Sequence, residues 1–267
     1  MKQVTSWFLF AFCLAIAHKK AMAAGPFDHS RQCLVVITES WSATSGQMFL
    51  LERSPASSWQ PQGSPIPVQV GKSGLAWGRG LTSTESLPGP VKKEGDEKAP
   101  AGVFRLGSAF GHASEIETRS TKMPYLALSE KNVAVDDSRS RYYNQIVDKS
   151  AIERPDWRSA EEMFGVNVYK WGIVVEHNIP PEAGAGSCIF LHVWESPTTP
   201  TSGCTAMGEQ DVVKLLRWLD PARGPLLVQL PRGIYNDLRV KWNLPDLMER
   251  AAPPATPKPS EGGSAPK

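Results

Sequence analysis

The sequence predicts one domain that is mostly β-structure, with a few helices. Short runs of β-branched and aromatic residues alternate with turn residues, and the 267-residue chain has 22 glycines and 23 prolines, which favours many turns. Hydrophobic residues make up 41% of the chain and charged residues 21%, a balance that supports a packed core. We assign residues 25–250 to this single domain.

Five segments in the first half combine β-branched or aromatic residues with flanking turn residues, and we predict them as strands or extended pieces. They are Gln32–Thr38, Gly46–Arg53, Ser64–Gly74, Ala101–Gly111 and Tyr125–Ser129. The polar stretches Leu81–Pro100 and Val135–Asp148 are predicted as loops. Ser159 and Glu162 have the spacing of a capping box, which predicts a short helical turn.

The second half predicts a pair of strands, a helix and a last strand. The apolar runs Gly172–Asn178 and Cys188–Trp194 are joined by a turn-rich segment, as in two paired strands with a long connecting loop. Apolar residues recur at i, i+3, i+4 and i+7 within Gly208–Asp220, which predicts an amphipathic helix with Gly208 as its N-cap. Pro225–Pro231 is the last predicted strand.

The two ends of the chain are predicted to lie outside the domain. Residues 1–24 have the pattern of a secretory signal peptide: Lys2, an apolar run from Val4 to Ala17, and the cleavage pattern Ala21-Met22-Ala23. The apolar run is short for a membrane span. We therefore expect export to the periplasm or cell envelope, with no membrane span after cleavage; a retained anchor is the alternative. Residues 251–267 are rich in Pro, Ala and Gly and predict a disordered tail.

The charge pattern gives no indication of a nucleic-acid partner. The formal net charge is +2, and residues 1–24 contribute three lysines and no acidic residue. The rest of the chain therefore has 26 basic and 27 acidic residues. Nucleic-acid binding needs a clustered basic face, which this balance does not suggest.

Three cysteines remain once the predicted leader is removed: Cys33, Cys188 and Cys204. An odd number in an exported chain leaves at least one thiol unpaired. Cys33 and Cys188 could form a disulfide in an oxidising compartment, or could both be small buried thiols. Sequence spacing leaves both readings open.

Cys204 and His192 are candidates for a nucleophile and its base. A cysteine attacks as its thiolate, and a free thiol with a pKa of about 8.5 is mostly protonated at neutral pH. The helix predicted to start at Gly208 would bring its positive end near the sulfur. Gly203 permits close backbone approach, and the N–H groups of Gly203 and Cys204 are candidate oxyanion donors. From spacing alone, an ordinary sheet histidine and a turn cysteine fit as well.

The segment from His192 to Gly208 resembles the catalytic motif of the L,D-transpeptidase (YkuD-like) family. That motif is a histidine, a variable loop, then Ser/Thr-His-Gly-Cys, an aliphatic residue, Arg, Leu and a helix start. Here His192 matches the first histidine, and Thr201, Gly203 and Cys204 match the threonine, the glycine and the nucleophile.

Two upstream segments extend the resemblance. Lys98–Leu106, "KAPAGVFRL", is similar to the family pattern Thr-Pro-x-Gly-x-Phe-x-Ile, and Pro67–Lys72 is similar to the strand ending in Gly-Lys that precedes it. The order and spacing agree over roughly residues 32–232. Two positions depart from the motif: Ser202 replaces its second histidine, and Ala206 replaces its arginine. The chain resembles a divergent branch that carries Ser-Gly-Cys-Thr-Ala-Met.

The resemblance implies a β-sandwich or open barrel that catalyses acyl transfer without a cofactor or metal. His192, oriented by the main-chain carbonyl of Val193, would take the proton of Cys204. The thiolate would attack a peptidoglycan stem peptide and form a thioester. An amine of a second stem peptide or of a cell-wall-linked lipoprotein would resolve it, or water would do so in a carboxypeptidase or hydrolase. A decayed cell-wall binding module is a further alternative.

Three further residues are weighed as substrate contacts: His177, Ser202 and Arg79. His177 either points toward the site or is a sheet-end histidine. Arg79 either takes over the role of the arginine missing at position 206 or is solvated or paired with an acid. The polar, aromatic loop around Asp136, Tyr143 and Asn144 is either a surface turn or a wall of the cleft.

A zinc site is the remaining alternative for these histidines. It would combine His177 and His192 with Cys204 or Glu176. Their spacing fits no short zinc motif, and we expect no metal.

Overall fold

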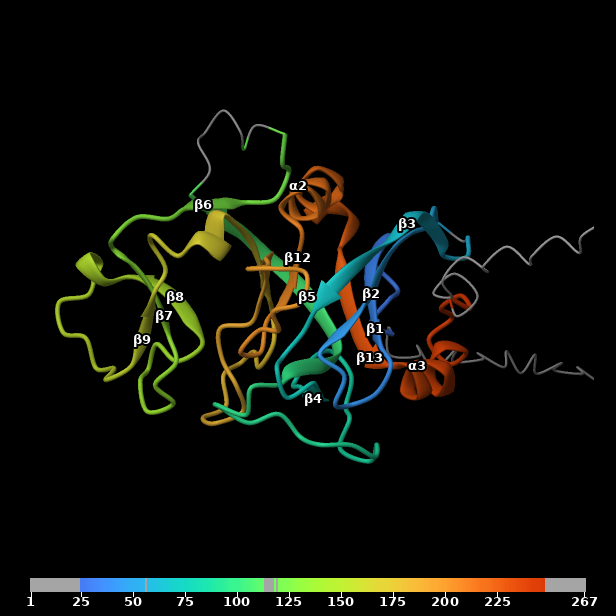
Figure 1. The fold of residues 1–267 in the computed structure, drawn as a ribbon, viewed down its shortest axis with the longest axis horizontal. Coiled ribbons are helices and arrows are strands. Elements are labelled where there is room, and N and C mark those ends of the chain that lie inside the picture. The colour runs from blue at the N-terminus through green and yellow to red at the C-terminus, as the bar shows by residue number, and fades with distance from the viewer. Residues whose placement is uncertain (1–24, 56, 113–117, 119, 248–267) are drawn as a thin grey trace, which may run out of the picture.

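The fold is a closed β-barrel with a small separate sheet beside it (Figure 1). The computed structural model describes residues 25–55, 57–112, 118 and 120–247. The predicted leader at 1–24 and tail at 251–267 lie outside these residues. Within the described residues, no helix is long and apolar enough to cross a membrane.

Eight strands form the barrel, in the order β10-β11-β12-β3-β2-β1-β13-β5, and β5 pairs back with β10 to close the ring. The β1–β13 and β11–β12 pairs are parallel, and the other pairs in the ring are antiparallel. The strands are β1 (Gln32–Thr38), β2 (Ser45–Glu52), β3 (Gln60–Gln69), β5 (Ala99–Gly111), β10 (Trp171–Val175), β11 (Phe190–Val193), β12 (Thr205–Met207) and β13 (Leu226–Pro231). Two short strands, β4 (Leu75–Trp77) and β6 (Tyr125–Ala127), pair with β5 from outside the ring. The predicted mostly β fold is confirmed, and closure makes it a barrel.

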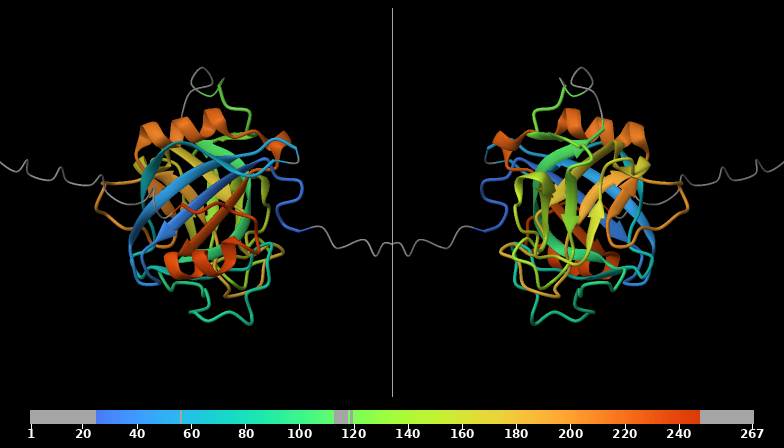
Figure 2. Two further views of the ribbon diagram at one scale, coloured as in Figure 1. Left: turned by 90° about the vertical axis from the view of Figure 1, so that its right-hand side faces the viewer. Right: turned by 90° about the vertical axis from the view of Figure 1, so that its left-hand side faces the viewer.

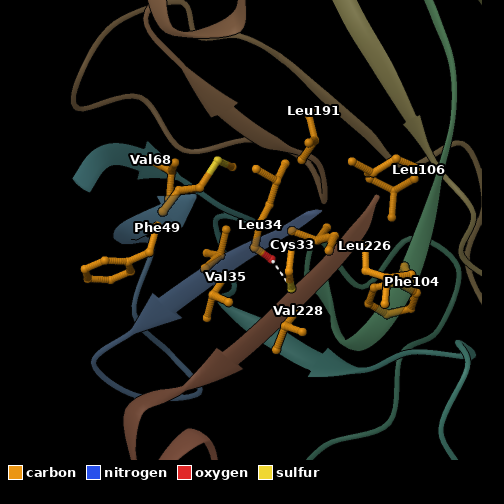
Figure 3. Packing of buried hydrophobic residues seen from close by; sticks show 14 of the residues in the cluster. Cys33, Leu34, Val35, Phe49, Val68, Phe104, Leu106, Leu191, Leu226 and Val228 are labelled. Carbon is orange, nitrogen blue, oxygen red and sulfur yellow. Dashed lines mark hydrogen bonds between the residues drawn. The ribbon is translucent and has the colours of Figure 1, made fainter. Parts of the chain in front are cut away.

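The barrel interior holds the main hydrophobic core, which explains the β-branched runs in the sequence. Every residue of β1 and β13 is buried. Figure 3 shows Cys33 at the centre of this core, with its thiol donating to the carbonyl of Leu34 at 3.6 Å. Cys33 is a free thiol and burial raises its pKa. Cys188 is also free and packs against a second, separate cluster, so these two cysteines are not joined in this structure.

Among the described residues, helices α2 and α3 lie at opposite sides of the barrel (Figure 2). The predicted helix is α2 (Glu209–Trp218), with Gly208 as its N-cap as expected, and it buries Val212, Leu215 and Leu216. The second helix, α3 (Arg232–Arg239), follows β13 directly and buries Tyr235 against the core. Three single turns of 3-10 helix complete the described elements: η1 (Lys149–Ala151), η2 (Asn167–Lys170) and η3 (Pro221–Arg223).

The small sheet corrects two predictions. It is antiparallel, in the order β8-β7-β9, and is formed by β7 (Asn132–Val135), β8 (Gln145–Asp148) and β9 (Ala160–Glu162). The end of the predicted loop 135–148 is therefore strand β8. The predicted helical turn at Ser159 is also wrong, because Ala160–Glu162 pairs with β7 and the Glu162 carboxylate binds Lys149 at 2.7 Å. Pairing between strands outweighs the local capping signal here.

Gly172 is the point at which three strands crowd together, and it provides a test of the packing. It pairs with His192 on β11 and with Phe110 on β5, and a Cβ at Gly172 would lie 2.3 Å from the Phe110 ring. We expect Gly172→Ala to lower the free energy of unfolding by about 1–3 kcal/mol through overpacking. Urea unfolding followed by fluorescence measures this.

Gly233→Ala is the matched control, because a Cβ at Gly233 in α3 would meet no atom within 4 Å. It should keep or raise stability by up to about 1 kcal/mol, as alanine favours a helix. Equal urea midpoints for the two variants would contradict the packing described at Gly172.

Candidate active site

The parallel pairing of β11 and β12 brings the two candidate catalytic residues together. His192 lies opposite Ala206, and Leu191 lies opposite Thr205. Cys204, one residue before β12, therefore reaches the start of β11, where the Phe190 N–H donates to its Sγ at 3.4 Å. Phe190 and His192 are two residues apart on β11, so their side chains lie on the same face of the strand. Leu191, between them, points the other way, into the barrel core (Figure 3). The site thus lies on the outer face of the barrel wall.

A cavity of about 480 Å³ opens over this face. Both His192 and Cys204 line it, as do the segment 199–203, Cys188 and Ala206. The opposite wall comes from the small sheet, through Ala134 of β7 and Glu161 of β9, and from the loop before β5. The small sheet and the barrel therefore enclose the candidate nucleophile and base between them.

The imidazole of His192 is set in one tautomer. Its Nδ1 lies 2.7 Å from the carbonyl oxygen of Val193. A carbonyl can only accept, so Nδ1 carries the hydrogen and Nε2 keeps a lone pair. His192 is 7% exposed, and burial lowers its pKa although the Val193 contact acts in the opposite direction. A neutral imidazole with a free Nε2 is the form that a general base requires.

A hydrogen-bonded turn presents Cys204. The Thr201 hydroxyl donates to the carbonyl of Cys204 at 2.6 Å and accepts from the Gly203 N–H at 3.1 Å. Gly203 has φ 147°, and a Cβ there would lie 3.2 Å from the Lys98 carbonyl, so glycine fits this position. Because Thr201 already uses the Gly203 N–H, the structure does not hold that amide ready as an oxyanion donor.

The thiol of Cys204 lies in a setting that disfavours its charged form. Burial raises the pKa of Cys204 to about 12, and the nearby Glu161 carboxylate acts in the same direction. The Phe190 N–H and the Lys92 ammonium lower this pKa, but by less. With the pKa of His192 lowered, the resting pair is a neutral thiol and a neutral imidazole.

The expected help from the helix is absent, because β12 separates Cys204 from α2. At about 3.3 Å per residue, the four residues from Cys204 to Gly208 span roughly 13 Å, beyond the first-turn reach of a helix dipole. The three residues of β12 had too weak a strand signal to be found from the sequence.

The candidate substrate contacts divide into two groups. Ser202 lines the cavity together with Ala206. His177 does not line it: the ring is 1% exposed, packs edge-on against Phe104 and places Nε2 3.0 Å from the carbonyl of Ala185. Burial lowers the pKa of His177 to about 4, so it matches the alternative of a buried structural histidine.

Arg79 also lies away from the cavity. It pairs with Glu182 and lines a neighbouring groove of about 590 Å³. Among the described residues that line the cavity of His192 and Cys204 there is no arginine. Arg79 therefore does not fill the place of the arginine missing at position 206.

The polar loop after β7 meets the cavity at one residue. Asp136 lines the cavity, whereas Tyr143 and Asn144 do not. Asn144 accepts from the Cys188 N–H at 2.8 Å and donates to the carbonyl of His177 at 2.8 Å. The Tyr143 hydroxyl donates to Glu94, and Ser187 donates to the same carboxylate at 2.8 Å. The concentration of Asp, Tyr and Asn in this loop was the one signal for it in the sequence.

Glu161 and Tyr169 are cavity residues that the sequence analysis did not single out. Glu161 fell in a predicted helical turn, and Tyr169 lies in η2 before the predicted strand pair. Their side chains meet in the structure, where the Tyr169 hydroxyl donates to Glu161 at 2.8 Å. Within the described residues, no group of three or more His, Cys, Asp or Glu side chains is placed to hold a metal ion.

Comparison with known families agrees with this geometry. The family model for the L,D-transpeptidase catalytic domain, YkuD, matches residues 59–229, more than half of the chain. The match includes β3, β5 and the β11–β12 pair with both candidate catalytic residues. No curated protein matches the sequence closely enough to count as a relative. The chain belongs to the L,D-transpeptidase catalytic-domain (YkuD) family.

Proposed function

We propose that this chain is an exported cysteine acyltransferase that forms a thioester between Cys204 and a peptidoglycan stem peptide. The observation that carries the proposal is the β11–β12 register, which puts a thiol and an imidazole with a free Nε2 in one cavity. Family membership supports peptidoglycan stem peptides as the general kind of substrate. The apolar run at Val4–Ala17 supports export.

The first half-reaction follows from the neutral resting pair. Nε2 of His192 removes the Cys204 proton as the sulfur attacks the amide carbonyl between the third residue of the stem and a terminal D-Ala. The carbonyl oxygen becomes an oxyanion, and we assign the N–H of Cys204 as its donor because Thr201 engages the Gly203 N–H. The C–N bond then breaks, the leaving amine takes the proton from the imidazolium, and a thioester remains.

The second half-reaction regenerates the thiol. An amine of a second stem peptide, or of a lipoprotein linked to the wall, loses a proton to His192 and attacks the thioester carbonyl. The C–S bond breaks, a new amide forms, and the imidazolium returns its proton to the sulfur. No cofactor or metal enters these steps.

Hydrolysis by the same site is the second candidate, and the replacements at Ser202 and Ala206 favour it. Both line the cavity where the family motif has larger basic side chains, so recognition of the acceptor differs from the common form. Incubation with purified muropeptides separates the two activities. Cross-linked dimers are expected for transfer; shortened stems without dimers would replace the transferase assignment by a carboxypeptidase or hydrolase.

Acylation by a carbapenem tests the nucleophile and base directly. We expect wild-type protein to gain one adduct that maps to the Cys204 peptide and not to Cys33 or Cys188. Cys204→Ala should gain none, and His192→Ala should react about 10²-fold more slowly, as expected on loss of a general base. Intact-protein and peptide mass spectrometry measure this. Normal acylation of Cys204→Ala would refute the proposal, and a decayed binding module predicts no adduct on the wild type.

The hydroxyl of Thr201 should be needed for fast acylation of Cys204, because it holds the turn that presents the sulfur. Thr201→Val keeps the shape but leaves the Cys204 carbonyl and the Gly203 N–H without their partner. We expect carbapenem acylation to slow about tenfold, because the nucleophile is displaced. Thr201→Ser keeps the hydroxyl and is the matched control, with a rate near wild type. If both variants react equally fast, the turn does not position the sulfur.

A further inference from the structure

Tyr169 is a buried residue beside the catalytic base that the proposed reaction does not use. It lies in η2, immediately before β10, with φ −94° and ψ 17°. This is the sparsely allowed region between helix and strand where many active-site residues lie. Its side chain is 5% exposed and lines the catalytic cavity.

The phenol ring packs against the face of β11 that carries the base. Its centroid lies 5.5 Å from that of His192 with the planes at 90°, and 5.8 Å from that of Phe190 with the planes at 88°. Phe110 of β5 closes the other side at 5.7 Å. The distances from Tyr169 to His192 and to Phe190 both fall in the range of favourable edge-to-face ring contacts. The Tyr169 ring therefore packs against two side chains on the same face of β11.

The hydroxyl of Tyr169 is held from the opposite wall. It donates to Oε2 of Glu161 on β9 at 2.8 Å. Burial raises the pKa of Glu161, and the bond from Tyr169 opposes this. Tyr169 therefore contacts both Glu161 of the small sheet, through its hydroxyl, and the imidazole of His192, through its ring.

We propose that Tyr169 is a positioning residue that holds the His192 imidazole in its reactive orientation, and that Glu161 anchors it from the small sheet. The inference rests on the proposed role of His192 as the base. The Val193 carbonyl fixes Nδ1 but leaves the ring free to tilt about that contact, and the Tyr169 ring blocks this tilt. The small sheet is thus a part of the catalytic machinery through one tyrosine.

Alkylation of Cys204 by iodoacetamide as a function of pH tests this without any substrate. The charged groups that act on Cys204 are Glu161 on β9 and Lys92 on the loop before β5. Below the thiol pKa, the rate depends on proton removal by neutral His192; at high pH the thiolate forms without a base. His192→Ala should lose the neutral-pH rate, by about 10²-fold, and converge with wild type at high pH.

Tyr169→Leu should show the same kind of pH profile as His192→Ala, with a smaller loss of rate. We expect the neutral-pH alkylation rate at Cys204 to fall about tenfold, with convergence at high pH, because the base is mispositioned while the thiol is intact. Tyr169→Phe keeps the ring and should lose only about two- to threefold. Glu161→Gln exchanges the charged acceptor of the hydroxyl for a neutral one, so its neutral-pH loss should not exceed that of Tyr169→Phe. Removal of the negative charge should also shift the alkaline limb to lower pH.

Tyr142→Leu is the matched control, since Tyr142 belongs to the same part of the fold and packs on Trp157 with ring centroids 5.5 Å apart. It should leave the profile unchanged. A normal profile for Tyr169→Leu, with His192→Ala impaired, overturns the positioning role and leaves the base assignment intact. Normal profiles for both variants overturn the base assignment itself, and with it the role of Tyr169. Folded Tyr169→Leu could also lose the same fraction of the rate at every pH. That result overturns the proposal, because a general loss of stability produces it and a mispositioned base does not.

Discussion

The site depends on the parallel pairing of two very short strands, β11 and β12. Because side chains alternate along a strand, a slip of one residue would turn His192 toward the barrel core and separate Cys204 from the Phe190 N–H. A three-residue strand cannot fix this register alone. Its neighbours do so: Thr205 donates to the buried Gln229 of β13 at 2.8 Å, and Gln229 donates to the Pro100 carbonyl of β5 at 2.9 Å. The contacts that join the barrel strands therefore also fix the geometry of the candidate site.

Burial sets the chemistry that this geometry can perform. It raises the pKa of the thiol and lowers the pKa of the imidazole, so both groups are neutral before substrate binds. In the proposed reaction, charge appears only when the proton moves from Cys204 to His192, and the cavity must then stabilise it. The orientation of the imidazole becomes decisive, because a neutral thiol reacts only when a correctly placed lone pair removes its proton. In the proposed reaction, the contacts of His192 with Val193 and Tyr169 therefore set the orientation on which proton removal depends.

The sequence predicts the barrel strands well because they are fully buried and rich in β-branched residues, as in β1 and β13. Cys204 and His192 could be found through a resemblance in their motif, although their placement in one cavity depends on a register that no local pattern encodes. The small sheet could not be found, since its strands have three or four residues and are stabilised by pairing between distant segments. His177 was misleading for a similar reason. Asn178 has φ 56°, which turns the chain after β10 and buries the imidazole against Phe104.

Strained backbone joins the small sheet to the barrel and shapes the cavity. Asn144, Asn178 and Cys188 all have positive φ, at a cost of about 1–3 kcal/mol each for a residue with a side chain. The Asn144 side chain connects them, accepting from Cys188 and donating to the carbonyl of Asn178 at 3.0 Å. Ser202 and Ala206 contribute short side chains to the cavity wall. The small sheet, the loop before β5 and the loop before β11 form the rest of the wall, and the hydrogen bonds of Asn144 fix the loop before β11 in its strained conformation.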